Sequence, residues 1–171
     1  MEDFTNATID TTRLPKFEEV AFSKLHPSYW KINLITILIL FLILGAVSGF
    51  FVYNLEELTS FRLFFAIAFI ILFLFALCFS RIAFNKKAFA FRDHDVLYKN
   101  GVIATNTTII PYNRIQHVAL HEGLLSRYFG LAKIQLFTAG GSSSDIAIPG
   151  IEKAQAENIK QLLMGKIQKQ L

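Results

Sequence analysis

Two long apolar runs limit what this 171-residue chain can fold into. The first covers residues 32–52, carries no charged residue and contains 15 Ile, Leu, Val or Phe side chains. The second covers about residues 62–80, with Arg62 at its start and Arg81 just beyond its end. A bilayer core of about 30 Å needs roughly 20 helical residues. Core helices of soluble proteins normally keep a polar stripe, which both runs lack. We therefore predict two transmembrane helices.

The segment between the two runs, residues 53–60, is too short to form a domain, so the helices must form an antiparallel hairpin over 32–84. Four Lys or Arg residues precede the first run within residues 1–31, and four follow the second within residues 81–92. The connector has none. Because Lys and Arg concentrate on the cytoplasmic side of a membrane, this distribution predicts that both termini are cytoplasmic. Residues 1–31 are interpreted as a polar cytosolic segment that precedes the hairpin.

Residues 85–171 form the third part of the chain, and their composition is that of a soluble domain rather than of a membrane-spanning segment. Their net charge is +5, against −1 for residues 1–31 and zero for 32–84, so this part carries the basic balance of the protein. Apolar residues alternate with polar ones in several short segments, which is typical of β-strands. The predicted strands cover residues 88–92, 96–98, 102–111, 115–121, 133–138 and 145–149.

The connections in this part also have recognisable signals. Asn100-Gly101 predicts a tight hairpin, residues 126–129 a short helical turn, and residues 140–144 a flexible loop. After Pro149-Gly150 the apolar spacing becomes helical and predicts an amphipathic helix of about 18 residues. The expected fold is an α+β membrane protein. A two-helix transmembrane hairpin precedes a bent antiparallel sheet of six or seven strands, capped by the C-terminal helix.

Several motifs support a family assignment. They are PYNRIQHV at residues 111–118, EGLLSRYFGLA at 122–132, TAGG at 138–141, and His26-Pro27 followed by Tyr29-Trp30. Together they resemble the bacterial YdbS-like membrane proteins with a pleckstrin-homology-like (PH-like) domain, over about residues 25–163. The resemblance implies a bent seven-stranded sheet capped by a helix, attached to a two-span hairpin. It also implies a multi-pass protein of the bacterial inner membrane. It implies no particular ligand.

The residues we single out first are Arg114, Gln116 and His117. A strand over 115–121 would place Arg114 and Gln116 on one face, with Ile115 and His117 on the other. An arginine fixed in a sheet suits bidentate binding of a carboxylate or a phosphate. Two interpretations of Arg114 remain open at this point. It is either a ligand contact or an ion-pair partner of a nearby carboxylate, the candidates being Asp93, Asp95 and Glu122.

Arg127 and Lys133 are the next candidates, either for a ligand contact or as a solvated basic surface. In the first apolar run, Gly45 and Gly49 form a Gly-x-x-x-Gly pattern that lets helices approach closely. This pattern fits packing inside the hairpin or association with another helix.

No catalytic, cofactor or metal site is predicted. His117 and His121 would lie about 13 Å apart on a strand, which is too far for one metal ion. Neither apolar run has an ionisable residue in its middle, where transporters and proton relays place them.

The resulting hypothesis is a non-enzymatic membrane protein whose cytosolic domain acts as a scaffold or interaction module for membrane proteins. The expected partners are the bilayer, together with a membrane protein or a second copy, and no nucleic acid. Two alternatives remain. The chain could be a small subunit of a transport or export system, or its basic domain could bind anionic lipid.

Overall fold

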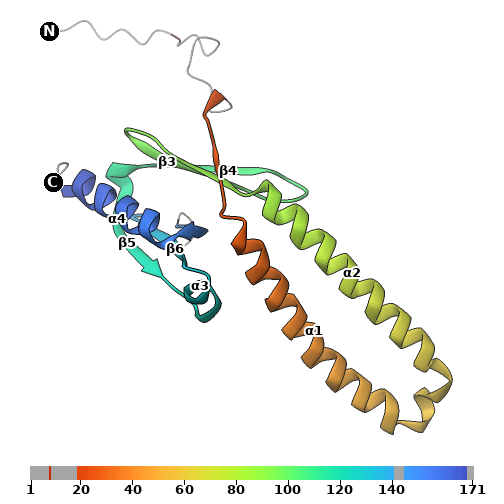
Figure 1. Cartoon of the computed structure of the whole chain (residues 1–171). Helices are drawn as coiled ribbons and strands as arrows, with labels where there is room; N and C mark the ends of the chain where they lie inside the picture. The colour runs from red at the N-terminus through yellow and green to blue at the C-terminus, as the bar shows by residue number, and fades with distance from the viewer. Residues whose placement is uncertain (1–7, 9–18, 141–144, 169–171) are drawn as a thin grey trace, which may run out of the picture.

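The computed structural model describes residues 8, 19–140 and 145–168. Its longest elements are α1 (Ser28–Asn54) and α2 (Arg62–Lys86), which are joined by the short 3₁₀ helix η3 (Glu56–Phe61). The two helices lie side by side and project away from the rest of the protein (Figure 1). None of the most apolar 18-residue window of either helix is buried inside the protein. This is the arrangement expected of helices whose surroundings are lipid, as the two apolar runs predict.

Arg62 closes the far end of the hairpin. Its guanidinium Nη2 donates to the Tyr53 carbonyl at 2.9 Å, and its Nε donates to the Val52 carbonyl at 3.3 Å. The last carbonyls of a helix have no partner within the helix, and a cation there also interacts favourably with the helix dipole. The single basic residue beside the connector therefore supplies hydrogen-bond donors to the last carbonyl groups of α1.

The remaining elements form two antiparallel sheets and two further helices. The first sheet has the order β1-β2-β3-β4 and the second has the order β5-β6-β7. The strands are β1 (Ser23–Lys24), β2 (Ala88–Phe91), β3 (Asp95–Asn100), β4 (Asn106–Pro111), β5 (Ile115–His121), β6 (Leu131–Thr138) and β7 (Ile146–Glu152). A 3₁₀ turn, η4 (Tyr112–Arg114), links the sheets, the short helix α3 (Leu124–Tyr128) links β5 to β6, and α4 (Lys153–Gln168) follows β7.

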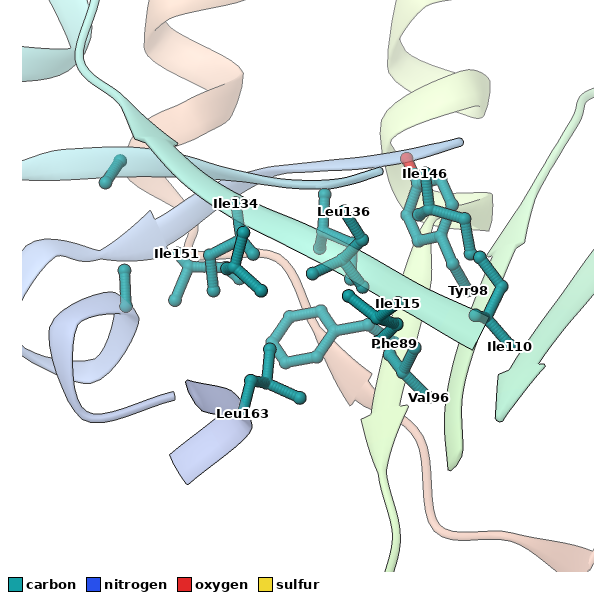
Figure 2. Close-up of a cluster of buried hydrophobic side chains, with 14 of the residues drawn as sticks. Phe89, Val96, Tyr98, Ile110, Ile115, Ile134, Leu136, Ile146, Ile151 and Leu163 are labelled. Atoms are coloured by element: carbon teal, nitrogen blue, oxygen red, sulfur yellow. The ribbon is translucent and has the colours of Figure 1, made fainter. Parts of the chain in front are cut away.

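The core lies between the two sheets and α4 (Figure 2). Phe89 and Val96 from the first sheet, Ile134 and Leu136 from the second, and Leu163 from α4 are all buried there. The alternation along β6 is nearly complete, because every second residue from Ile134 to Thr138 is buried. The α+β fold with a helix-capped bent sheet is therefore present as predicted.

The first strand of the sheet comes from the segment before the membrane hairpin. Ser23 pairs with Phe89 and Lys24 with Ala88, so β1 extends the sheet alongside β2. Leu25 follows and is only 4% exposed in the shared core. The sequence pattern assigned residues 1–31 to a separate polar segment and began the soluble part at 85. A two-residue strand is too short to show alternation, so nothing in the pattern marked it.

The connection between β3 and β4 also differs from the prediction. Asn100 is the last paired residue of β3 and faces Asn106, so residues 101–105 form a five-residue loop. The expected two-residue turn would have placed 102–105 in the strand. Gly101 has a φ of 106°, and a Cβ there would lie 2.0 Å from the Ala104 carbonyl oxygen. The glycine signal was thus correct, but the loop that it opens is wider than Asn-Gly alone suggested.

A close contact fixes the hairpin to the soluble domain. The His26 amide donates to the Gly150 carbonyl at 2.8 Å, immediately before α1 begins. Gly150 has a φ of 68°, and a Cβ on it would lie 2.7 Å from Cγ of Tyr29. Only glycine combines this backbone conformation with this approach of the Tyr29 ring. The base of α1 is therefore held directly against β7.

We expect Gly150→Ala to destabilise the full chain by roughly 1–3 kcal/mol, because alanine is strained at positive φ and its methyl group overlaps Tyr29. Gly123→Ala is the matched control, since Gly123 has a φ of −72° and nothing lies within 4 Å of its Cβ position. Thermal unfolding of both variants in detergent measures the effect. Equal melting temperatures for the two variants would contradict the contact.

Candidate functional site

Arg114 does not lie on a strand. It ends the 3₁₀ turn η4 and is exposed, while its carbonyl accepts a hydrogen bond from the Ala139 amide at 3.2 Å. Two of its three expected carboxylate partners bind other cations. Asp95 pairs with Arg92, and Glu122 pairs with Lys153 at 3.1 Å.

No ion pair among the described residues includes Arg114. Asp93, Asp95 and Glu122 therefore form no ion pair with Arg114 among the described residues. Arg114 lines a hollow of about 380 Å³ together with β4 residues, Thr138 and Gly140.

The start of β5 contains a bulge that changes which side chains point outward. The pairing with β6 shifts between Ile115, which faces Thr138, and His117, which faces Phe137. Ile115 and Val118 are buried, whereas Gln116 and His117 are both exposed. Strict alternation had placed Gln116 and His117 on opposite faces. Because a bulge inserts one residue, it presents both polar side chains on the outside at this point.

Gln116 and His117 line a hollow between β5 and the C-terminal half of α4. The hollow has a volume of about 240 Å³ and is completed by Val118, Lys160, Met164 and Ile167. The His117 ring lies 5.6 Å from the Phe137 ring, centroid to centroid, on the neighbouring strand. We call this feature the β5–α4 groove. The α4 residues that form it were not among the candidates, because their helical spacing indicated only a core-facing helix.

The β5–α4 groove runs beside an edge of the second sheet. β5 pairs with β6 on one side, and no strand among the described residues pairs with its other side. An edge strand presents unpaired backbone N–H and C=O groups along that side. The groove therefore combines backbone donors and acceptors with the apolar side chains of Val118, Met164 and Ile167, and with one cation, Lys160.

Arg127 and Lys133 lie elsewhere. Lys133 faces His121 at the far end of β5, four pairs from the pair of His117 with Phe137, which corresponds to about 13 Å along the strand. Arg127 is exposed on α3, beyond that end of β5. The structure thus distributes the predicted candidates over separate surfaces rather than bringing them into one site.

The main electrostatic cluster outside the membrane is structural. Arg92 Nε donates to an Asp95 carboxylate oxygen at 2.6 Å, and this hydrogen bond is the main cause of the raised pKa of Arg92. The Tyr112 hydroxyl donates to the Arg92 carbonyl at 2.5 Å. Burial, and to a lesser extent the Asp95 and Asp93 charges, raise the pKa of Tyr112 to about 12. The pKa values of Arg92 and Tyr112 are both raised further from neutral, so these two side chains brace the β2–β3 turn and do not act as an acid or base near neutral pH.

Gly45 and Gly49 differ in how closely the neighbouring helix approaches them. A Cβ on Gly45 would lie 3.2 Å from Cζ of Phe69, so Gly45 allows α1 and α2 to approach. Nothing lies within 4 Å of a Cβ on Gly49. Both glycines line a hollow of about 440 Å³ between the helices. Of the two, only Gly45 has a close neighbour on α2, so packing inside the hairpin remains the interpretation for Gly45 and helix association remains open for Gly49.

Comparison with known families identifies the family of this chain. A family model described as "Bacterial PH domain" matches residues 31–167, which is most of the sequence. The chain belongs to this family. The family resemblance and the fold inferred from the sequence motifs are both confirmed.

Two proteins of Bacillus subtilis (strain 168) are similar to this chain. The UPF0699 transmembrane protein YdbT is 30% identical over 118 residues, which cover 68% of this chain and 24% of YdbT. The UPF0699 transmembrane protein YdbS is 28% identical over 68 residues, which cover 40% of this chain and 41% of YdbS. The chain spans less than half the length of these relatives. No solved structure matches. With two apolar helices in place, the chain is a transmembrane protein with a bacterial PH domain, similar in sequence to these two UPF0699 proteins.

We expect Gly45→Leu to destabilise the hairpin, because the larger side chain overlaps Phe69 in a packed helix interface. Gly49→Leu is the matched substitution and should leave the melting temperature in detergent unchanged, because its side chain enters open space. If the two variants lower the melting temperature equally, the assignment of Gly45 alone to internal packing is wrong. A change in oligomer size for Gly49→Leu alone would assign that glycine to helix association.

Proposed function

We propose that this protein is a non-enzymatic interaction module of the bacterial inner membrane, in which the PH-like domain binds a segment of another membrane protein. The observation that carries the proposal is the β5–α4 groove beside an unpaired strand edge. Edge strands with an adjacent groove bind extended peptides by adding a strand to the sheet. In that mode the backbone supplies affinity and side-chain hollows supply specificity.

The side chains of the groove define the chemistry of the partner segment. Met164 and Ile167 offer an apolar surface beside the buried Val118, and methionine adapts to different side-chain shapes. Lys160 adds a positive charge at the same place. The fitting partner is an extended segment with an apolar side chain that enters the hollow and an acidic side chain near Lys160.

The position of the groove suits a receptor that is fixed in the membrane. The N-terminal end of α4 lies near the base of α1, because Gln155 lines the same hollow as His26 and Pro27. The C-terminal end reaches the β2–β3 turn, where Lys166 Nζ donates to the Asp93 carbonyl at 3.0 Å. Because the groove is lined by residues 160–167 of α4, it lies on the part of the domain away from the base of α1.

We propose further that the domain and both termini are cytoplasmic. Two independent observations support one side for both flanks. The Lys and Arg residues lie almost entirely outside the connector. In addition, β1 before the hairpin and β2 after it belong to one sheet, so the two flanks must lie on the same side of the membrane.

The groove is tested with the substitution Met164→Glu. A carboxylate placed among Val118 and Ile167 should weaken partner binding roughly tenfold or more, because it is desolvated there without a partner. Leu162→Glu is the matched control, since Leu162 is similarly exposed on the same helix but does not line the groove. A photo-crosslinking residue at position 164 in living cells first captures the partner, and binding of that purified partner to each variant in nanodiscs is then measured.

This experiment has two outcomes that contradict the proposal. One is identical crosslinked products from positions 164 and 162, because the groove would then have no selectivity. The other is equal affinity of Met164→Glu and Leu162→Glu for the captured protein. Thermal unfolding of both variants confirms that neither loses its fold.

The topology is tested with reporters fused after residues 1, 57 and 171. A periplasmic reporter such as alkaline phosphatase should be active only at residue 57, and a cytoplasmic reporter only at the two ends. Periplasmic activity at residue 171 would contradict the cytoplasmic placement of the domain.

A further inference from the structure

Three large side chains outside the transmembrane helices are almost fully exposed. Ile103, in the loop between β3 and β4, is 96% exposed. Leu124 and Tyr128, at the two ends of α3, are 91% and 84% exposed. Single exposed apolar residues are common on proteins, but these three are more exposed than any other large apolar residue among those described. The location of these side chains in the fold determines which molecules they can contact.

The strand register places the Ile103 loop at the membrane end of the first sheet. Ala88, two residues after the end of α2, faces Lys99 of β3. β3 therefore continues past the start of β2 and leads into residues 101–105 on the side from which α2 emerges. Figure 1 shows this turn reaching beyond the end of α2. The opposite end of the same sheet is the β2–β3 turn, which includes His94.

The second sheet presents α3 at the same end. The Gly130 carbonyl accepts a hydrogen bond from the Lys153 amide, and Leu131 faces Glu152 two residues after Gly150. Gly150 in turn contacts the base of α1 through His26 and Tyr29. α3 packs near α1, and Figure 1 shows it beside the first turns of that helix. The Ile103 loop and α3 thus lie on the two sides of the hairpin, where it leaves the domain.

Aromatic and basic side chains at the base of the hairpin mark this end of the domain as the membrane interface. Tyr29 and Trp30 lie in the first turn of α1, with the Arg81 guanidinium 5.0 Å from the Trp30 ring and Lys87 Nζ 6.0 Å from the Tyr29 ring. Such residues concentrate at the headgroup level, where an apolar ring and a cation are both satisfied. Arg127, between Leu124 and Tyr128, adds a cation to α3 itself.

We propose that Ile103, Leu124 and Tyr128 insert into the lipid headgroup layer beside the hairpin, so that the domain rests on the bilayer at three points. The occupant of this surface is lipid because the surface continues the membrane boundary marked by Trp30 of α1 and Arg81 of α2, which contact each other where the hairpin leaves the domain. The hairpin fixes the position of the domain in the plane, and the two flanking contacts fix its tilt. This contact does not depend on the β5–α4 groove, which lies on the part of the domain away from the base of α1.

Depth measurements on the full chain in nanodiscs test the proposal. In a Cys78→Ala background, single cysteines at 103, 124 or 128 carry an environment-sensitive fluorophore, and the nanodiscs contain phosphatidylethanolamine and phosphatidylglycerol with or without doxyl-labelled lipid. All three positions should show emission shifted to shorter wavelength and quenching by doxyl lipid. His94→Cys and Ala139→Cys are the matched controls, because both are exposed at the opposite ends of the two sheets. Both controls should show aqueous emission without quenching.

The proposal is overturned if positions 103, 124 and 128 behave like positions 94 and 139. It is also overturned if their protection requires two copies in one nanodisc, since the surface would then bind a second protein. A further measurement uses Ile103→Asp combined with Leu124→Asp, which should increase water access to a fluorophore at position 128. A combined variant that leaves position 128 as protected as before would contradict the shared contact.

Discussion

The pairing of β1 with β2 is the interaction on which the rest of this structure depends. The two strands are adjacent in the sheet, but the whole membrane hairpin lies between them in the chain. Their pairing brings the two ends of the hairpin together and makes both part of one sheet. The contact of Gly150 with Tyr29 then sets the base of α1 against β7. The domain is therefore not a separate body on a tether but is built around the base of the helices.

This construction gives the two ends of the domain different roles. The end near the helices carries α3, the β3–β4 loop and the aromatic and basic side chains of the interface. The other end carries the β2–β3 turn, held by Arg92 and Asp95, and the adjoining end of α4, held by Lys166. The proposed binding groove lies near that second end, because its α4 residues adjoin Lys166. A partner can therefore reach the groove without displacing lipid.

The membrane hairpin and the class of the soluble fold could be predicted because each depends on long, repetitive signals. Twenty-one uncharged residues permit few structures, and the alternation in β6 extends over most of the strand. The features that were missed depend on single residues and long-range partners. β1 has only two residues, and the bulge at Gln116 is set by its pairing with β6, which local sequence does not encode.

In the candidate site, too, some residues could be predicted from the sequence and others could not. Gln116 and His117 could be selected from the motif that carries them, and both line the groove. Met164 and Ile167 could not, because their spacing fits any amphipathic helix and only the packing of α4 against β5 gives them a shared surface. Arg114 was placed on a strand because it precedes one. The turn η4 instead leaves it exposed, and Asp95 and Glu122 bind closer cations.

The position of β1 also has a consequence for biosynthesis. The ribosome releases Ser23 long before Phe89, and two apolar helices must enter the membrane between these events. The sheet can be completed only when α2 has crossed in the correct direction, because otherwise β2 emerges on the opposite side from β1. A wrongly inserted chain would lack Leu25 in its core and would leave an edge of β2 without its neighbour. The soluble fold is therefore complete only in chains whose hairpin is correctly inserted. Proteases that remove incompletely folded domains can distinguish these chains from wrongly inserted ones.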